Sequence, residues 1–250
     1  MWQYLGTRIG KLYQELEDLK PRFSICIPVW EQHGFGLQYL KDLIHSIQIQ
    51  TFHDWEIVIS DHSQNFDISD YCFEEWKNDY TIRYVKYDEN YGNGVANLNN
   101  ALKMANGEII KIMFQDDFMF THKCLEALHE TFQDENTKWA VCGCNHTRDG
   151  VKFERPMVPS WNNYLLEGIN TISSPSVLAF RNENIELFDE NLTMLMDVEY
   201  YYRLGRRYGL PTILEDCLVT NRCHENQISS RYSGNLGDEV RYCKEKYDSN

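Results

Sequence analysis

Residues 108–121 read EIIKIMFQDDFMFT, and this stretch decides the fold that we expect. The apolar run 109–114 predicts a strand buried on both faces, as in a parallel sheet. Asp116 and Asp117 follow where that strand leaves the sheet. In open α/β sheets ligands bind at the carboxyl ends of strands, so the two acids are a candidate seat for a divalent cation and the phosphates it carries. Alternatively, they cap a helix that we expect to begin at Thr121.

The composition is typical of a globular chain with one α/β domain. Of the 250 residues, 42% are apolar and 25% are charged, and these values exclude wholesale disorder. One large domain is favoured over two small ones at this length. The formal net charge of -14 argues against nucleic acid as a partner, because no basic surface stands out that would neutralise its phosphates.

Cysteine usage and hydropathy bear on the location of the protein. The eight cysteines include no CxxC pair, and several lie in apolar runs, which suits reduced, buried thiols. No apolar segment approaches the roughly 20 residues that span a bilayer, and no signal peptide opens the chain. We therefore expect a cytoplasmic protein without a membrane span.

Strands and helices alternate along the first 120 residues. We expect strands over residues 23–29, 55–60, 82–87 and 109–114, and helices over residues 37–47, 69–77 and 95–105. Pro28 is expected to end the first strand, and Gly107 to close the third helix as a left-handed cap. The alternation predicts a parallel, doubly wound sheet flanked by helices. There is no GxGxxG or GxxxxGK[ST] loop, so the signatures of ordinary dinucleotide and P-loop binding are missing.

The second half of the chain is less regular and predicts a smaller mixed subregion. We expect strands over residues 139–144, 173–180 and 217–223, a hairpin or loop over residues 150–159, and a short helix over residues 161–167. Residues 191–195 lead into a helix that carries Asp197, Glu199 and Arg203.

The two ends of the chain are expected to be helical. Residues 1–21 carry apolar side chains at helical spacing and predict an amphipathic helix that packs on its own domain or on a second subunit. Residues 238–247 predict a helix in the tail.

Five motifs, in this order, carry a family resemblance. They are FSICIPV (23–29), WEIVISDHS (55–63), NYGNGVANLNNALKMANGEIIKIMFQDD (90–117), FDENLTMLMDVEYYYRLGRRYGLP (188–211) and RCHENQIS (222–229). Together they resemble the family 2 glycosyltransferases, which are inverting enzymes with the GT-A fold, over residues 22–230. No Q-x-x-R-W signature is present, which argues against a processive polysaccharide synthase.

The resemblance implies a Rossmann-like, mostly parallel central sheet and a defined reaction. A sugar would pass from a nucleoside-diphosphate sugar to a hydroxyl of a carbohydrate acceptor, in glycan or polysaccharide assembly, with Mn²⁺ or Mg²⁺. The implied division is an N-terminal helix (1–21), a catalytic domain (22–232) and a helical tail (233–250). Within the domain, residues 22–120 would bind the nucleotide and residues 121–232 would carry the acceptor site and the base.

The resemblance also assigns residues. Asp197 would be the catalytic base, and Asp116, Asp117 and His224 would hold the metal or the diphosphate. Asp61 would contact the nucleobase edge. The remaining donor-binding candidates, with Asp116 shared between ribose and metal, are Pro28, Val29, Glu31, Asn90, Gly94, Asn97 and Gln115.

The chemistry of glycosyl transfer also requires two acid sites. A hydroxyl is a poor nucleophile near neutral pH, so a carboxylate must take its proton as the new bond forms. The departing diphosphate gathers negative charge, which a carboxylate-bound metal neutralises. Each residue also has a structural alternative. Asp197 suits a helix start, Asp61 a turn and His224 a purely structural contact, while Glu199 and Arg203 suit a surface ion pair.

Six weaker candidates are suggested only by their position in the sequence or by their charge. Trp161, Asn162 and Tyr164 fall where an acceptor sugar would stack, although aromatic residues at such spacing are more often core. Candidates for helping with the diphosphate are Arg155, Arg222 and Arg231.

Two other functions stay open. A sugar-1-phosphate nucleotidyltransferase would need a Gly-rich, basic loop after the first strand, and PVWEQHGFG (28–36) has no Lys or Arg. A domain that binds nucleotide sugar or a partner protein without catalysis is kept open by Phe114 and Met196, which depart from the family pattern.

Overall fold

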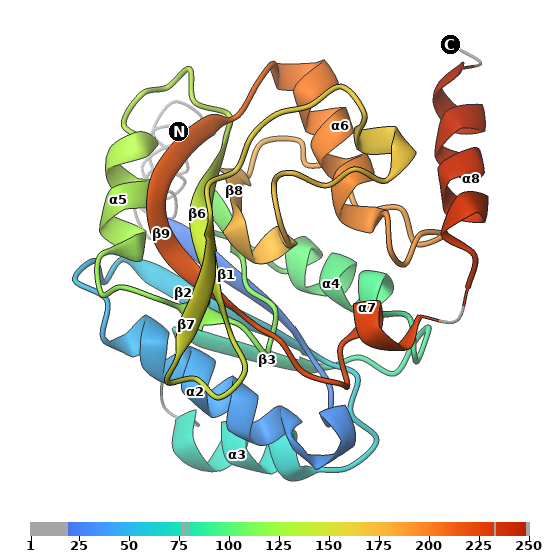
Figure 1. The fold of residues 1–250 in the computed structure, drawn as a ribbon. Coiled ribbons are helices and arrows are strands. Elements are labelled where there is room, and N and C mark those ends of the chain that lie inside the picture. The colour runs from blue at the N-terminus through green and yellow to red at the C-terminus, as the bar shows by residue number, and fades with distance from the viewer. Residues whose placement is uncertain (1–19, 77–78, 80, 233, 249–250) are drawn as a thin grey trace, which may run out of the picture.

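A computed structural model describes residues 20–76, 79, 81–232 and 234–248, and the predicted helix over residues 1–21 falls almost entirely outside this part. The described strands form one mixed sheet in the order β3-β2-β1-β4-β8-β6-β9-β5, with β7 paired to β6 (Figure 1). Helices cover the sheet, so the predicted α/β class is confirmed.

The first half of the sheet is parallel, as predicted. Its strands are β1 (Phe23–Val29), β2 (Trp55–Asp61), β3 (Ile82–Lys86) and β4 (Ile109–Ile112). β1 lies at the centre, between β2 and β4. Pro28 is tolerated there because the pairing with β4 stops at Cys26. No β4 carbonyl therefore loses a ladder hydrogen bond because proline has no N–H.

Three helices connect these strands, each with an apolar face on the sheet. They are α2 (Gly36–Gln48), α3 (Asp67–Trp76) and α4 (Gly94–Lys103). Figure 1 shows α2 and α3 on one side of the sheet and α4 on the other. The alternating connections bring the carboxyl ends of β1, β2 and β4 to one edge of the sheet.

Gly107 was predicted to be a left-handed cap of the third helix, and this prediction was wrong. α4 ends at Lys103, and Gly107 is not among the residues with positive φ. A Cβ at Gly107 would lie 2.5 Å from the backbone nitrogen of Ser24. The glycine is therefore required by the close approach of the α4–β4 connection to β1, and not by a left-handed cap.

The second half is mixed and differs in detail from the prediction. Its elements are β5 (Phe118–Met119), α5 (Cys124–Thr131), β6 (Trp139–Thr147), β7 (Phe153–Met157), β8 (Leu178–Arg181), α6 (Met196–Tyr208), β9 (Thr212–Arg222), α7 (Ile228–Arg231) and α8 (Leu236–Asp248). The helix after the acid pair begins at Cys124, and not at Thr121, because residues 118–119 pair with β9 first.

Two further segments were predicted wrongly. Residues 161–167 contain a 3-10 turn, Leu165–Glu167, in place of a helix. In the predicted strand over residues 173–180, a 3-10 turn, Pro175–Val177, precedes β8.

β9 brings the end of the domain back to the acid pair. It pairs antiparallel with β5 and parallel with β6, so Thr220 lies beside Phe118. All eight cysteines are free thiols, as predicted. None of the helices in the described part of the chain combines the length and apolar character that crossing a membrane requires.

Candidate active site

The carboxylate of Asp61 is fully buried at the end of β2. Its Oδ1 accepts a hydrogen bond of 2.7 Å from the backbone N–H of Ser63, and its Oδ2 accepts one of 2.7 Å from the Tyr84 hydroxyl. Lys86 lies 3.5 Å from Oδ2. Burial and the bond to Asp61 raise the pKa of Tyr84, so Tyr84 remains a donor. The structure thus places Asp61 at the predicted strand end but engages both of its oxygens within the protein.

Several polar groups gather beside Asp61 at the end of β1. The Val29 carbonyl accepts hydrogen bonds from the Asn97 side chain, at 3.0 Å, and from the backbone N–H of His62, at 2.9 Å. The buried oxygens Asn97 Oδ1 and Ser63 Oγ have no hydrogen-bond partner in the protein. Because buried polar groups are rarely left unpaired, this pair of oxygens points to a ligand or water at this edge.

Gln115 organises the loop between β1 and α2. Its Oε1 accepts from the Trp30 backbone N–H at 3.0 Å and from the Gln32 side chain at 3.2 Å, and its Nε2 donates to the Gly36 carbonyl at 2.7 Å. Gln115 is buried and both ends of its amide are hydrogen-bonded to the loop, so it shapes the loop. Glu31, in the same loop, accepts from the Gln64 backbone N–H at 3.1 Å.

The glycine-rich loop before α4 is held by its own asparagines. Asn93 caps α4, because its side chain accepts from Val95 N and Ala96 N. Asn90 has a positive φ of 53°, a conformation that asparagine tolerates. A Cβ at Gly94 would meet the Ile228 side chain at 3.7 Å, so α7 lies against the start of α4.

The structure brings Asp116 and His224 together, although 107 residues separate them in the sequence. The imidazole Nε2 of His224 lies 2.8 Å from Asp116 Oδ2, and both side chains are partly exposed. Tyr39 packs against the His224 ring with centroids 5.2 Å apart. A carboxylate oxygen and an imidazole nitrogen at this distance can bind one cation.

Asp117 is bound by the backbone of β9. Its Oδ1 accepts a 3.0 Å hydrogen bond from the backbone N–H of Arg222, and the residue is buried. Burial raises the pKa of Asp117, and the neighbouring charge of Asp116 raises it further. The side chain therefore ties β9 to the acid pair, and the structure does not present it beside His224.

The three arginines proposed for the diphosphate all have partners within the protein. Arg222 donates to Asp42 at 2.8 Å and to the Asp116 carbonyl at 3.0 Å. Arg155 donates to Cys223 Sγ, and Arg231 lies 2.6 Å from His33 Nε2. Arg222 thus fixes the position of the loop that carries His224.

Asp197 lies in the first turn of α6 and is partly exposed. Its Oδ1 accepts from the backbone N–H of Val198 and its Oδ2 from the Asn170 side chain, both at 2.7 Å. Burial raises the pKa of Asp197 to about 7, although the two hydrogen bonds that the carboxylate accepts lower the pKa. A carboxyl with this pKa is half ionised at neutral pH, which suits a general base.

A chain of hydrogen bonds connects Asp197 to the acid pair. Asn170 donates to the Ser173 carbonyl at 3.1 Å, and Asn221 of β9 donates to Ser173 Oγ at 2.9 Å. The next residue after Asn221 is Arg222, whose N–H binds Asp117. Ser173 has φ 102°, a strained value for a residue with a side chain. The segment 170–176 therefore spans from the base to the acids.

Sequence reasoning missed Asn170, Ser173 and Ser176. The Ser176 hydroxyl accepts a 2.9 Å hydrogen bond from the backbone N–H of Phe114, two residues before Asp116. No motif marks these residues, because their role depends on contacts between distant segments.

The proposed acceptor residues mostly pack the structure. Trp161 lies against Trp139, with ring centroids 6.1 Å apart, and Asn162 holds the loop through Thr171 at 2.7 Å. Tyr164 is 57% exposed and remains available to a sugar.

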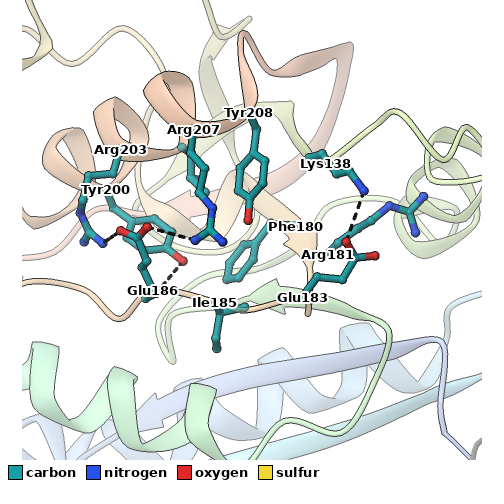
Figure 2. Close-up of a pocket in the computed structure, with 11 residues that line it drawn as sticks. Lys138, Phe180, Arg181, Glu183, Ile185, Glu186, Tyr200, Arg203, Arg207 and Tyr208 are labelled. Atoms are coloured by element: carbon teal, nitrogen blue, oxygen red, sulfur yellow. Dashed lines mark hydrogen bonds and ion pairs between the residues drawn. The ribbon is translucent and has the colours of Figure 1, made fainter.

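A separate cavity lies between β8 and α6, and none of the predicted site residues lines it (Figure 2). Glu186 accepts from Arg203 at 2.8 Å and from Arg207 at 3.0 Å across its wall, so its carboxylate is paired with both guanidinium groups.

Asp116 and His224 fit a divalent cation as a partial site. No group of three or more His, Cys, Asp or Glu side chains within the described ranges is arranged to hold a metal ion. The chain would therefore supply two ligands, one oxygen and one nitrogen, and phosphate oxygens and water would complete the coordination.

The chain is similar in sequence to a known protein over most of its length. "Putative teichuronic acid biosynthesis glycosyltransferase TuaG" of Bacillus subtilis is 24% identical over 220 residues, which cover 86% of this chain and 84% of that protein.

Two solved structures share the fold. S. aureus TarS 1-349 in complex with UDP-GlcNAc matches with TM-score 0.66 and 17% identity, over 90% of this chain and 66% of that one. Mannosyltransferase PcManGT from Pyrobaculum calidifontis, in complex with GDP-Man and Mn²⁺, matches with TM-score 0.57 and 16% identity, over 81% of this chain and 57% of that one. The GT-A fold expected from the sequence is thus confirmed.

The family model for Glycosyl transferase family 2 matches residues 24–191, which include β1 and the acid pair. The match covers more than half of the chain, and the fold agrees with it. The chain therefore belongs to glycosyl transferase family 2.

Proposed function

We propose that this chain transfers a sugar from a nucleoside-diphosphate sugar to a hydroxyl of a carbohydrate acceptor, with inversion at the anomeric carbon. One observation carries the proposal. The segment 170–176 connects the carboxylate of Asp197 by hydrogen bonds to β9, next to the pair formed by Asp116 and His224. Two separated acid sites joined by one segment suit a single displacement, which needs a base for the acceptor and a cation for the leaving group.

Asp197 acts as the base in this proposal. Its carboxylate takes the proton of the acceptor hydroxyl while the acceptor oxygen bonds to the anomeric carbon. The bond from that carbon to the diphosphate oxygen breaks in the same step, and the nucleoside diphosphate leaves. The pKa of about 7 supports the role, because the carboxylate is then basic enough to take the proton and still largely ionised above neutral pH.

Asp116 and His224 would hold Mn²⁺ or Mg²⁺. When bound, the ion neutralises the charge that gathers on the departing diphosphate. The complex of a structural neighbour with GDP-Man and Mn²⁺ supports this assignment. Asp117 belongs to the site through Arg222 and the backbone of β9.

The donor site is the edge formed by β1, β2 and the start of α4. Asn97 Oδ1 and Ser63 Oγ support it, since both are buried and unpaired. Asp61 acts there by holding Ser63 and Tyr84 in place.

The acceptor belongs to polysaccharide assembly in this proposal, in line with the relative named for teichuronic acid biosynthesis. The eight free cysteines support a reducing, cytoplasmic location.

A panel of UDP-, GDP- and dTDP-sugars tests the proposal. We expect one donor class to raise the melting temperature in the presence of Mn²⁺, because a ligand bound only by the native state stabilises it. With that donor, metal-stimulated hydrolysis should be seen without any acceptor. Donor binding without hydrolysis or transfer would favour a domain that binds nucleotide sugar and has no catalytic activity.

A further inference from the structure

The helix that carries Asp197 begins without a cap of its own. Leu195 is the N-cap residue of α6, and no side chain at that position accepts a hydrogen bond. Leucine is among the poorest residues at this position, because the free backbone N–H groups at a helix start need acceptors. The chain that leads into α6 would be expected to fray.

Glu239 of α8 supplies an acceptor for the N-cap residue and for the two residues that lead into it. Its Oε1 accepts from the backbone N–H of Thr193 at 3.2 Å, and its Oε2 accepts from Met194 at 3.0 Å and Leu195 at 2.8 Å. The Tyr232 hydroxyl donates to Oε1 at 2.7 Å. Glu239 is only 8% exposed, so three consecutive backbone N–H groups converge on one buried carboxylate.

α8 is fastened to α6 by further contacts that fix the position of Glu239. Lys246 donates to Glu199 at 2.8 Å and to Asp189 at 2.7 Å, and Tyr247 also donates to Glu199. Glu199 is completely buried, so its bond to Arg203 is not the surface ion pair that the sequence allowed.

We propose that Glu239 is a positioning residue for the base, because it holds residues 193–195 and so fixes the turn on which Asp197 stands. The inference rests on the proposed function for its catalytic meaning. The helical tail, which lies outside the stretch matched by the family model, is then a working part of the active site.

The charge of Glu239 has a second effect. The titratable groups that act on Asp197 are Glu239 from α8 and Tyr201 from the next turn of α6. Burial is the main reason for the raised pKa of Asp197, and the negative charge of Glu239 raises it further. Burial raises the pKa of Tyr201, which stays neutral. Removing the charge of Glu239 should therefore lower the pKa of the base.

Hydrogen exchange of the wild-type chain tests the contact without any substrate. The amides of residues 193–195 should be protected. In Glu239→Gln an NH₂ group that cannot accept replaces one carboxylate oxygen. The amides of Met194 and Leu195, which bind Oε2, should then exchange roughly ten- to hundredfold faster, as expected for lost hydrogen bonds to a charged group. Asp238→Asn is the matched control, because the Asp238 carboxylate forms an ion pair with Arg241 and its side chain is 57% exposed. Fast exchange of these amides in the wild type would overturn the proposal, even if Glu239→Gln fails to fold.

The pH profile tests the catalytic meaning. With the donor that the panel identifies, Glu239→Gln should lower kcat by about tenfold, leave KM for the donor unchanged and move the rise of kcat with pH to lower pH. Asp238→Asn should match the wild type. Unchanged kcat and an unchanged profile in folded Glu239→Gln would overturn the positioning role. Wild-type turnover in Asp197→Asn would instead overturn the proposed base, so the two failures are distinguishable.

Discussion

Asp197→Asn should abolish transfer and stabilise the fold at the same time. The substitution keeps the size of the side chain and removes its charge. As the proposed base, Asp197 accounts for about 10²- to 10⁴-fold in rate, which the variant should lose. Donor binding should be unaffected, because Asp197 bonds to Val198 and Asn170 and to no group at the donor edge.

The gain in stability follows from the sign of the pKa shift. The pKa of Asp197 rises from 3.8 to about 7 on folding, so ionisation is easier in the unfolded chain. The protonated carboxyl therefore favours the folded state below pH 3.8, and this contribution is lost as pH rises through about 7. Three units correspond to roughly 4 kcal/mol at most.

Part of this gain is offset in the variant. An amide cannot accept both hydrogen bonds that the carboxylate accepts, and the lost one costs roughly 1.5–3 kcal/mol. A net gain of about 1–2 kcal/mol remains, which corresponds to a rise in melting temperature of about 2–8 °C for a chain of this size.

Thermal melts at pH 5 and pH 8 and a pH–rate profile measure both effects. The gain should be larger at pH 8 than at pH 5, and wild-type kcat should rise about tenfold per pH unit below pH 7 and then level off. Asp189→Asn is a control for which we expect the opposite change in melting temperature. Although burial alone would raise the pKa of Asp189, the Lys246 ammonium holds it at about 2, so this variant should melt at a lower temperature. A pH-independent rate, or an active Asp197→Asn, would refute the reasoning.

Three further predictions follow from the site. Asp116→Asn and His224→Ala should each remove the Mn²⁺ dependence of donor binding in calorimetry, because each removes one of two protein ligands; equal metal dependence in both variants and the wild type would count against the pair. Asp61→Ala should weaken nucleotide binding and lower the melting temperature by leaving Ser63 and Tyr84 without their acceptor; unchanged values would contradict this role. Gln115→Ala should lower donor affinity by loosening the loop after β1, with retained affinity as the opposing result.

The elements of the first half could be predicted because local signals agree with the fold there. The apolar runs of β1, β2 and β4 and the apolar faces of α2 and α4 lie where the sequence placed them. Gly107 shows the limit. The sequence reveals that a glycine is present, but only the packing shows that the Ser24 backbone requires it.

The second half and the details of the site depend on contacts that leave no local signal. β5 has two residues and exists because β9 returns beside it from about 100 residues further along. The orientation of Asp117 follows from its bond to the Arg222 backbone, which no pattern near residue 117 indicates. Glu239 likewise lies in an ordinary surface-like helix pattern, and its role depends on residues 193–195.

A crystal structure with Mn²⁺ and a non-hydrolysable analogue of the donor tests the central claim most directly. We expect the diphosphate against Asp116 and His224, the nucleoside beside Asn97 and Ser63, and the anomeric carbon open to the carboxylate of Asp197. An anomeric carbon turned away from Asp197, with another carboxylate beside it, would contradict the account.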